Sequence, residues 1–193
     1  MLRHLLTSED WTEVEFQSIG EAALYGWIER HVCRIAHVDG SMSSGLLING
    51  YVVFPCKSHS RGVIRFSHGV RGFGVRDMHI DHRLGLAFVR FDDESFVMEA
   101  TGRPTTVMLV GIVKEARMFR LATCMVVIGG HDSSTGILSA ICDSMFDCNV
   151  GGFVAVDPKA KQVYGIAHEP TDDVNVGIVP VMDVLATVNE LRS

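Results

Sequence analysis

Residues 105–128 read TTVMLVGIVKEARMFRLATCMVVI, two long apolar runs that are separated by a short charged segment. Runs rich in Val, Ile, Leu and Phe with turn residues between them are typical of β-strands. We therefore predict two strands here, Thr105–Lys114 and Met118–Ile128. Turn residues recur about every 8–12 positions in the rest of the chain, which favours a β-sandwich or barrel over alternating strands and helices.

The same pattern of short apolar runs separated by turn residues extends from residue 31 to residue 180. The other predicted strands are His31–Val38, Gly45–Ile48, Tyr51–Phe54, Gly62–Phe66, Phe73–Ile80, Leu86–Phe91, Ile137–Ile141, Phe153–Asp157, Gln162–Ala167 and Val174–Pro180. About a dozen strands, divided near Gly102-Arg103-Pro104, predict an all-β fold of two six-stranded antiparallel β-barrels, residues 31–102 and 103–193.

Both ends of the chain have helical spacing. Met182–Leu191 places Val184, Leu185, Val188 and Leu191 on one face, which predicts a C-terminal helix. Residues 1–30 have an N-cap pattern at Ser8 and near-helical apolar spacing around Trp27. We expect them to form an N-terminal arm of one or two short helices.

Composition excludes several classes of protein. The 193 residues fit one large domain or a two-lobed one, with 47% hydrophobic and 21% charged residues. A net charge of −6 argues against a general polyanion binder. No apolar run approaches a membrane span, and the acidic start is unlike a signal peptide. Five cysteines without a CxxC pair disfavour a disulfide framework or zinc finger and suggest a reducing compartment.

The stretch with the clearest chemistry is Phe146–Val156, FDCNVGGFVAV, in which Cys148 precedes a Gly-Gly pair and an apolar strand. A thiol on a tight glycine-bearing turn can be a nucleophile beside backbone N–H groups. The alternative is a turn with a buried cysteine, since cysteine is among the most buried residue types. His59, just beyond the strand Tyr51–Phe54, stands where a scaffold can hold a catalytic base, although a solvated loop histidine fits too.

The order of these elements resembles the chymotrypsin-like cysteine proteases of positive-strand RNA viruses, the picornaviral 3C type. The resemblance spans about residues 45–182. The segments that carry it are Val52-Val53-Phe54-Pro55 with His59, Gly85–Phe96, Asp147-Cys148 with Gly151-Gly152, and Gly165–His168 with Asn175–Pro180.

The resemblance implies a cysteine endopeptidase that processes a viral polyprotein in the host cytoplasm, without metal or cofactor. Cys148 would attack the scissile carbonyl, and His59 would take and return the proton. The backbone N–H groups of Cys148, Asp147 and Phe146 would hold the oxyanion. His168 would lie in the specificity pocket, flanked by Asp143 or Ser144. There it would donate to a Gln or Glu side chain before the scissile bond.

The chain departs from the family pattern at several of these positions. Phe146 stands where a glycine is usual, Asn149-Val150 separates the cysteine from the glycine pair, and His168 comes one residue later than usual. The third catalytic residue would fall at Gly85, so Asp81 is the candidate acid, and a Cys–His pair without an acid is also chemically sufficient.

Two other classes of function therefore stay open. The first is a catalytically degenerate protease-like fold that binds protein or RNA, and the second is a cellular trypsin-like domain that binds partners. Arg71, Arg76, Arg83 and Arg90 could form a basic face for viral RNA, but the interleaved acids favour a solvated mixed face. His79, Asp81 and His82 are not expected to bind a metal, because adjacent strand residues point to opposite faces.

Overall fold

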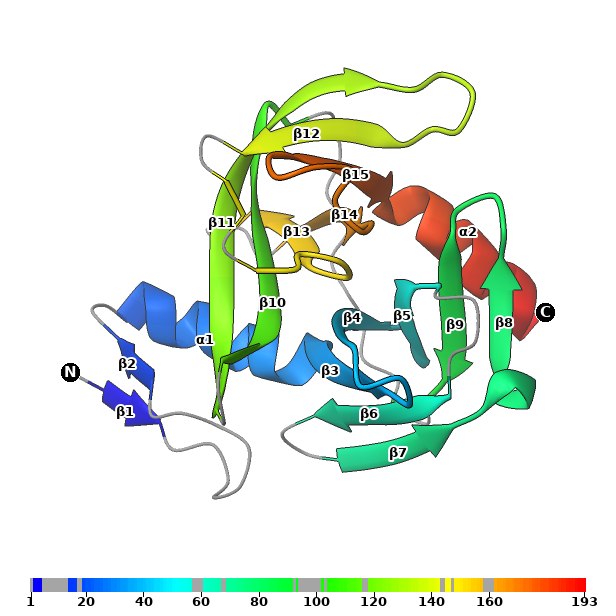
Figure 1. The fold of residues 1–193 in the computed structure, drawn as a ribbon, viewed down its shortest axis with the longest axis horizontal. Coiled ribbons are helices and arrows are strands. Elements are labelled where there is room, and N and C mark those ends of the chain that lie inside the picture. The colour runs from blue at the N-terminus through cyan, green and yellow to red at the C-terminus, as the bar shows by residue number, and fades with distance from the viewer. Residues whose placement is uncertain are drawn as a thin grey trace.

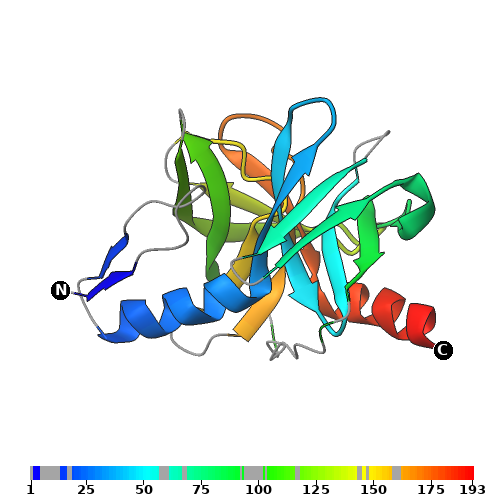
Figure 2. The same ribbon diagram turned by 90° about the horizontal axis from the view of Figure 1, so that it is seen from below.

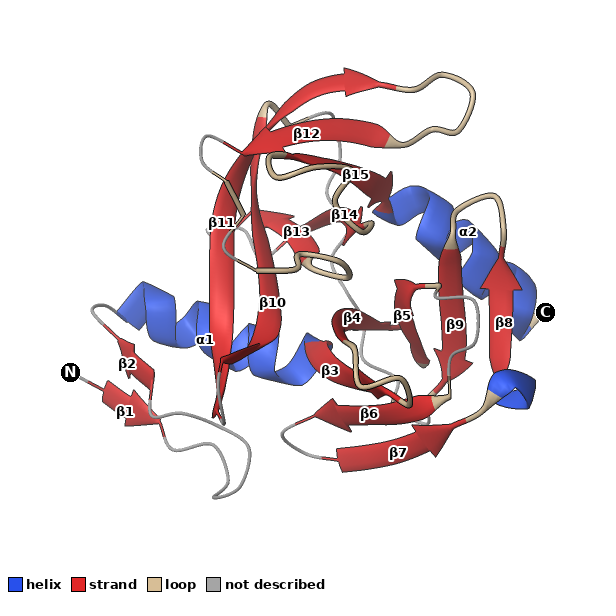
Figure 3. Ribbon diagram, viewed as in Figure 1, coloured by secondary structure: helices blue, strands red, loops and turns tan. Residues whose placement is uncertain are grey.

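The structure is a computed structural model that describes residues 2–4, 14–16, 19–56, 61–66, 69–91, 93, 102, 104–115, 118–142, 145–146, 148–157 and 162–193. Two β-sheet units lie side by side, and one long helix precedes them while another follows them (Figures 1 and 3). This architecture agrees with the predicted all-β class.

The first unit is an antiparallel sheet of seven strands. In chain order they are β3 (Val32–His37), β4 (Met42–Ile48), β5 (Tyr51–Pro55), β6 (Gly62–Phe66), β7 (Gly69–Phe73), β8 (Met78–Asp81) and β9 (Leu86–Arg90). Their order across the sheet is β7-β6-β3-β4-β5-β9-β8. The strands next to each other in sequence, β7 and β8, therefore form its two edges, so the sheet is not closed by a β7–β8 pair.

The expectation of a closed six-stranded first barrel is thus corrected. The predicted strand Phe73–Ile80 is interrupted by a 3-10 turn, η1 (Val75–Asp77). The Asp77 carboxylate accepts the Gly74 N–H at 2.7 Å, and the Asp77 N–H donates to the Gly74 carbonyl at 3.0 Å. This local turn ends β7 and changes the direction of the chain before β8 begins. Most of β7 escaped prediction because Gly69 and Gly72 weaken its strand pattern.

The second unit is a closed barrel of six antiparallel strands, as predicted. They are β10 (Thr106–Glu115), β11 (Met118–His131), β12 (Leu138–Cys142), β13 (Val154–Asp157), β14 (Gln162–Ala167) and β15 (Asn175–Pro180). The order around the barrel is β10-β11-β12-β15-β14-β13. Alternation of buried and exposed positions along β12 shows one face turned to the barrel interior.

The N-terminal arm is partly strand. Two short strands, β1 (Leu2–His4) and β2 (Val14–Phe16), pair antiparallel before the helix α1 (Ile19–His31). The expected N-cap at Ser8 lies outside the described residues. The second helix, α2 (Val181–Arg192), matches the predicted C-terminal helix. Figure 2 shows both helices on one face of the molecule. Neither described helix is long and apolar enough to cross a membrane.

The two units share a core. One cluster of buried side chains contains Leu46 and Phe88 from the first sheet, Ile112 and Val154 from the second barrel, and Val184 from α2. Each unit also has a separate interior cluster. Burial of apolar surface between the units therefore fixes their relative position.

A buried serine adds directional bonds to this interface. The Ser44 hydroxyl oxygen accepts the Ile112 N–H at 2.8 Å, and the hydroxyl can donate to the Ile112 carbonyl at 3.2 Å. The Ser44 N–H donates to the Gly151 carbonyl at 3.2 Å. Next to it Gly152 has φ +81°, and a Cβ there would overlap the Ser44 carbonyl.

We predict that Gly152→Ala lowers the free energy of unfolding by at least about 2 kcal/mol, because the new methyl group meets backbone and the φ is unfavourable. Urea denaturation measures this value. Gly72→Ala is the matched control, because a Cβ at Gly72 meets nothing within 4 Å. Equal stability of the two variants would contradict the close approach of the units at Gly152.

Candidate functional site

Cys148 lies in the segment that joins β12 to β13, beside the shared interface. Its side chain is half-buried and packs, with Phe146, against the interior cluster of the second barrel, which contains Val150 and Phe153. The Asn149 side chain accepts the Gly151 N–H at 2.8 Å, and the Phe153 N–H donates to the Val150 carbonyl at 3.0 Å. The sequence that follows the cysteine is therefore a compact turn.

The glycine pair ties this turn to both units. The Gly151 carbonyl accepts the Ser44 N–H from β4, and the Gly152 N–H donates to the Ala167 carbonyl at the end of β14, at 2.8 Å. A Cβ on Gly151 would stand 2.7 to 2.9 Å from the carboxylate of Glu169. The turn is thus held by backbone hydrogen bonds on two sides, with a carboxylate lying over its first glycine.

The segment before the cysteine has a partner of its own. The Phe146 N–H, one of the predicted oxyanion donors, donates to the Asp173 carbonyl at 2.8 Å. An oxyanion role for this N–H requires that bond to open. Asp173 belongs to a loop closed by Asp172, whose carboxylate accepts the Val174 and Asn175 N–H groups and the Asn175 amide. These bonds, the Val174 N–H foremost, lower the pKa of Asp172.

Several of the predicted site residues lie outside the described part of the chain. They are His59, Asp143, Ser144 and Asp147. The strand that leads to His59 is described: β5 ends at Pro55, and the Cys56 N–H donates to the Gly85 carbonyl at 2.9 Å. The start of the segment that carries His59 is therefore tied to the turn between β8 and β9.

Asp81, the predicted third catalytic residue, ends β8 and caps that turn. Its Oδ1 accepts the N–H groups of Arg83 at 2.9 Å and Leu84 at 3.0 Å, and its Oδ2 accepts the Thr187 hydroxyl from α2 at 3.0 Å. Burial acts to raise the pKa of Asp81, but the bonds from Leu84, Thr187 and Arg83 and the Arg83 charge outweigh it, so the pKa is lowered.

His168, the predicted pocket residue, directly follows β14. Its Nε2 is 2.5 Å from the Leu84 carbonyl oxygen in the first unit. The ring also lies 3.4 Å from the position of a Cβ on Gly85, a residue with φ +65°. The structure thus brings His168 together with the turn that Asp81 caps.

The described residues include all five cysteines, none of which is in a disulfide. Burial raises the pKa of the Cys33 and Cys56 thiols, which disfavours their reactive thiolate form. Within the described ranges no three His, Cys, Asp or Glu side chains form a group that could hold a metal ion.

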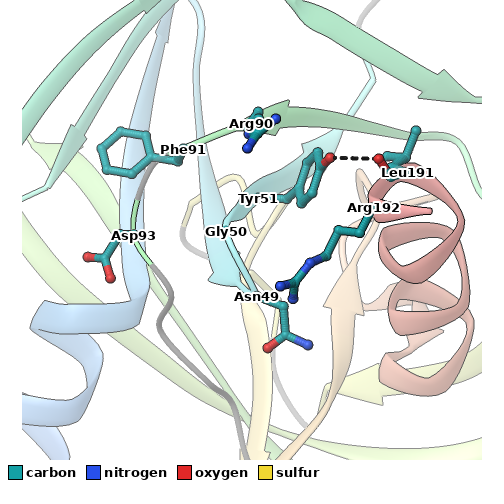
Figure 4. A pocket seen from close by; sticks show the side chains of 8 residues that line it. All are labelled: Asn49, Gly50, Tyr51, Arg90, Phe91, Asp93, Leu191 and Arg192. Atoms are coloured by element: carbon teal, nitrogen blue, oxygen red, sulfur yellow. Dashed lines mark hydrogen bonds between the residues drawn. The ribbon is translucent and has the colours of Figure 1, made fainter.

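Described residues line two hollows that lie away from the cysteine turn. One of about 470 Å³ is bounded by the β4–β5 turn, the end of β9 and the last turn of α2, where the Tyr51 hydroxyl donates to the Leu191 carbonyl at 3.2 Å (Figure 4). The other, of about 370 Å³, lies at the start of α2 beside Tyr164. None of the described residues predicted for the site lines either hollow.

Sequence reasoning missed the residues that connect these parts. No local pattern indicates that Ser44, Thr187 and Leu84 contact residues more than 60 positions away. Nor does any local pattern indicate that Glu169 lies beside Gly151. The Gly151-Gly152 pair was one indication, since a glycine lets another part of the chain approach the backbone closely.

No protein-family model and no curated protein sequence matches the chain. Solved structures match its fold. The active form of the Rv3671c protease from M. tuberculosis has TM-score 0.63 and 12% identity, over 93% of this chain and 88% of that one. The tobacco etch virus protease complexed with product has TM-score 0.59 and 15% identity, over 90% and 86%. A human pathogenic astrovirus serine protease has TM-score 0.57 and 11% identity, over 78% and 90%.

These neighbours are viral and bacterial proteases, and the architecture is consistent with their chymotrypsin-like two-barrel fold. At such low identity the likeness shows the fold alone. It does not single out the picornaviral 3C type.

The Asp81 bonds give a pH-dependent prediction. A carboxyl whose pKa is lowered in the folded state stabilises the fold above its unfolded pKa, and this contribution is lost as the pH falls through the folded value. Asp81→Asn should therefore lower the free energy of unfolding by about 1 kcal/mol at pH 7. The difference in the free energy of unfolding between the wild type and Asp81→Asn should disappear below about pH 4, the ordinary pKa range of an aspartate.

Urea denaturation from pH 7 to pH 3 measures this effect. Thr187→Val removes the same bond from the other side, so the double variant should lose less than the sum of the single variants. If this difference in the free energy of unfolding stays constant across the pH range, the Thr187 hydroxyl and the turn do not depend on the ionised form of the Asp81 carboxyl group.

Proposed function

We propose that this protein is a cysteine endopeptidase, with the Cys148 thiol as nucleophile and the His59 imidazole as general base. The observation that carries the proposal is the setting of Cys148: a half-buried thiol, in a turn bonded to both the open sheet and the closed barrel. A nucleophile needs a rigid support and backbone donors close by, and such a turn can supply both.

The chemistry would proceed through an acyl-enzyme. His59 takes the proton of the Cys148 thiol, and the thiolate attacks the scissile carbonyl to form a tetrahedral intermediate. The Cys148 and Asp147 N–H groups stabilise the oxyanion, and the Phe146 N–H joins them when its bond to the Asp173 carbonyl opens. The C–N bond then breaks as His59 returns the proton to the leaving amine, and water hydrolyses the thioester. A thiol is partly ionised near neutral pH, so this pair works without an acid at Gly85.

The substrate class rests on the family resemblance. We propose a viral polyprotein in the host cytoplasm as substrate, cut after Gln or Glu. Two of the fold neighbours are viral proteases, which is compatible with this proposal, and the bacterial neighbour shows that the fold is not confined to viruses. The preference for Gln or Glu comes from the same resemblance, in which His168 would donate to that substrate side chain.

A second function is favoured by two observations. The Phe146 N–H is engaged by the Asp173 carbonyl, and Gly85 stands at the position of the family's acid, as expected if catalysis has been lost and the fold binds protein or RNA. Activity measurements separate the two functions.

We predict that the wild type cuts a fluorogenic peptide with Gln or Glu before the scissile bond. Cys148→Ala and His59→Ala should each lower kcat/KM by at least about 10³-fold, because both groups act in one step. Cys124→Ala, at another half-buried cysteine, should keep full activity. Circular dichroism and the thermal midpoint establish that each variant is folded.

Alkylation with iodoacetamide tests the thiol independently of any peptide. Cys148 should react at least about tenfold faster than Cys124, and His59→Ala should remove the difference, since a nearby imidazolium favours the thiolate. If wild type and Cys148→Ala are equally inactive and the two thiols react equally fast, the binding function is correct.

A further inference from the structure

Asn149 directly follows the cysteine, and its side-chain amide is held in one orientation. Its Oδ1 accepts the Gly151 N–H at 2.8 Å, a bond from a side chain to the backbone two residues later. An N–H can only donate, so the oxygen of the amide must face Gly151 and Nδ2 must point away from it. The turn therefore determines which way the two N–H groups of Asn149 are presented.

The rest of the turn keeps this orientation rigid. Val150 is almost fully buried, and the Gly151 carbonyl accepts the Ser44 N–H from the first unit. Asn149 itself is exposed, so its Nδ2 lies on the accessible side of the segment. Within the described ranges this amide makes no second hydrogen bond. Beside Cys148 the chain thus carries a preorganised donor that is available to a bound molecule.

One of the backbone donors proposed for the oxyanion is occupied in the structure. The Phe146 N–H donates to the Asp173 carbonyl at 2.8 Å, and the Asp172 carboxylate closes the loop that holds this carbonyl. When a thiolate adds to a peptide carbonyl, negative charge develops on the oxygen. Asparagine side chains as well as backbone N–H groups can stabilise such an oxygen. Asn149 has the chemistry to take the place of the occupied donor.

We propose that Asn149 is a further catalytic residue: its Nδ2 donates a hydrogen bond to the oxygen of the scissile carbonyl as the Cys148 sulfur adds to the carbonyl carbon. This inference rests on the proposed function. It gives the two ends of one amide separate tasks, since Oδ1 accepts a bond that holds the turn and Nδ2 donates a bond that forms in the transition state.

Two variants separate these tasks. Asp has the shape of Asn and keeps an oxygen for the Gly151 N–H but has no amide donor, whereas Ala loses both groups. In urea denaturation Asn149→Asp should be as stable as the wild type, and Asn149→Ala less stable. In peptide cleavage both should lower kcat by about 10²-fold with KM within about twofold, because the lost bond is made only in the transition state. Asn189→Asp adds the same charge at an exposed position of α2 and should match the wild type.

A peptide aldehyde tests the oxygen site without turnover. The Cys148 sulfur adds to the aldehyde carbon, the C=O double bond becomes single, and the thiol proton ends on the oxygen of the resulting hemithioacetal. The Kd of the aldehyde should rise at least about fivefold in both Asn149 variants, because this adduct resembles the tetrahedral intermediate. Iodoacetamide forms no such oxygen centre. The rate of Cys148 alkylation at high pH, where the thiol is ionised in every variant, should therefore stay within about twofold of the wild type.

Either of two results would overturn the inference. One is a folded Asn149→Asp that keeps the kcat and the aldehyde affinity of the wild type, since the amide donor would then have no part in the reaction. The other is alkylation at high pH that slows as much as kcat in both variants, since the substitutions would then displace the thiol itself. If the wild type neither cuts the peptides nor binds the aldehyde, the proposed function fails, and this outcome is distinct because it does not depend on any Asn149 variant.

Discussion

The double hydrogen bond between Ser44 and Ile112 is the interaction on which the site depends most. Ser44 is almost fully buried, and a buried hydroxyl must find partners, so its two bonds to Ile112 hold β4 against β10 in one register. The same residue binds the Gly151 carbonyl through its N–H. The position of the turn that carries Cys148 is therefore set by the first unit as well as by its own barrel.

Backbone groups make nearly all of the described contacts that hold this turn. Such bonds form with almost any side chain, which explains how Phe146 and Asn149 can occupy this segment while the turn keeps its place. The glycines are different, because Gly151 and Gly152 are needed where the Glu169 carboxylate and the Ser44 carbonyl come close. Different side chains are therefore accepted at positions 146 and 149, whereas positions 151 and 152 require glycine.

The sequence predicted the second unit better than the first, because the strand signals of the second unit are local. The second-barrel strands are marked by apolar or alternating runs, whereas in the first unit Gly69 and Gly72 weaken β7 and Asp77 closes a turn inside a predicted strand. The compact turn after Cys148 was predicted from the Gly151-Gly152 pair. The partners of Asp81 and His168 were not, because contacts across 106 and 84 positions depend on the fold, which leaves no local pattern in the sequence.

The contacts of the C-terminal helix α2 determine when the fold can be completed during synthesis. Val184 and Val188 of α2 complete the core between the units, while Thr187 and Leu191 bind Asp81 and Tyr51 across 106 and 140 positions. During translation the first sheet is therefore synthesised long before the residues that finish its packing. Because contacts this distant in sequence form slowly, the two units should mature together after the helix has left the ribosome, as one late cooperative step.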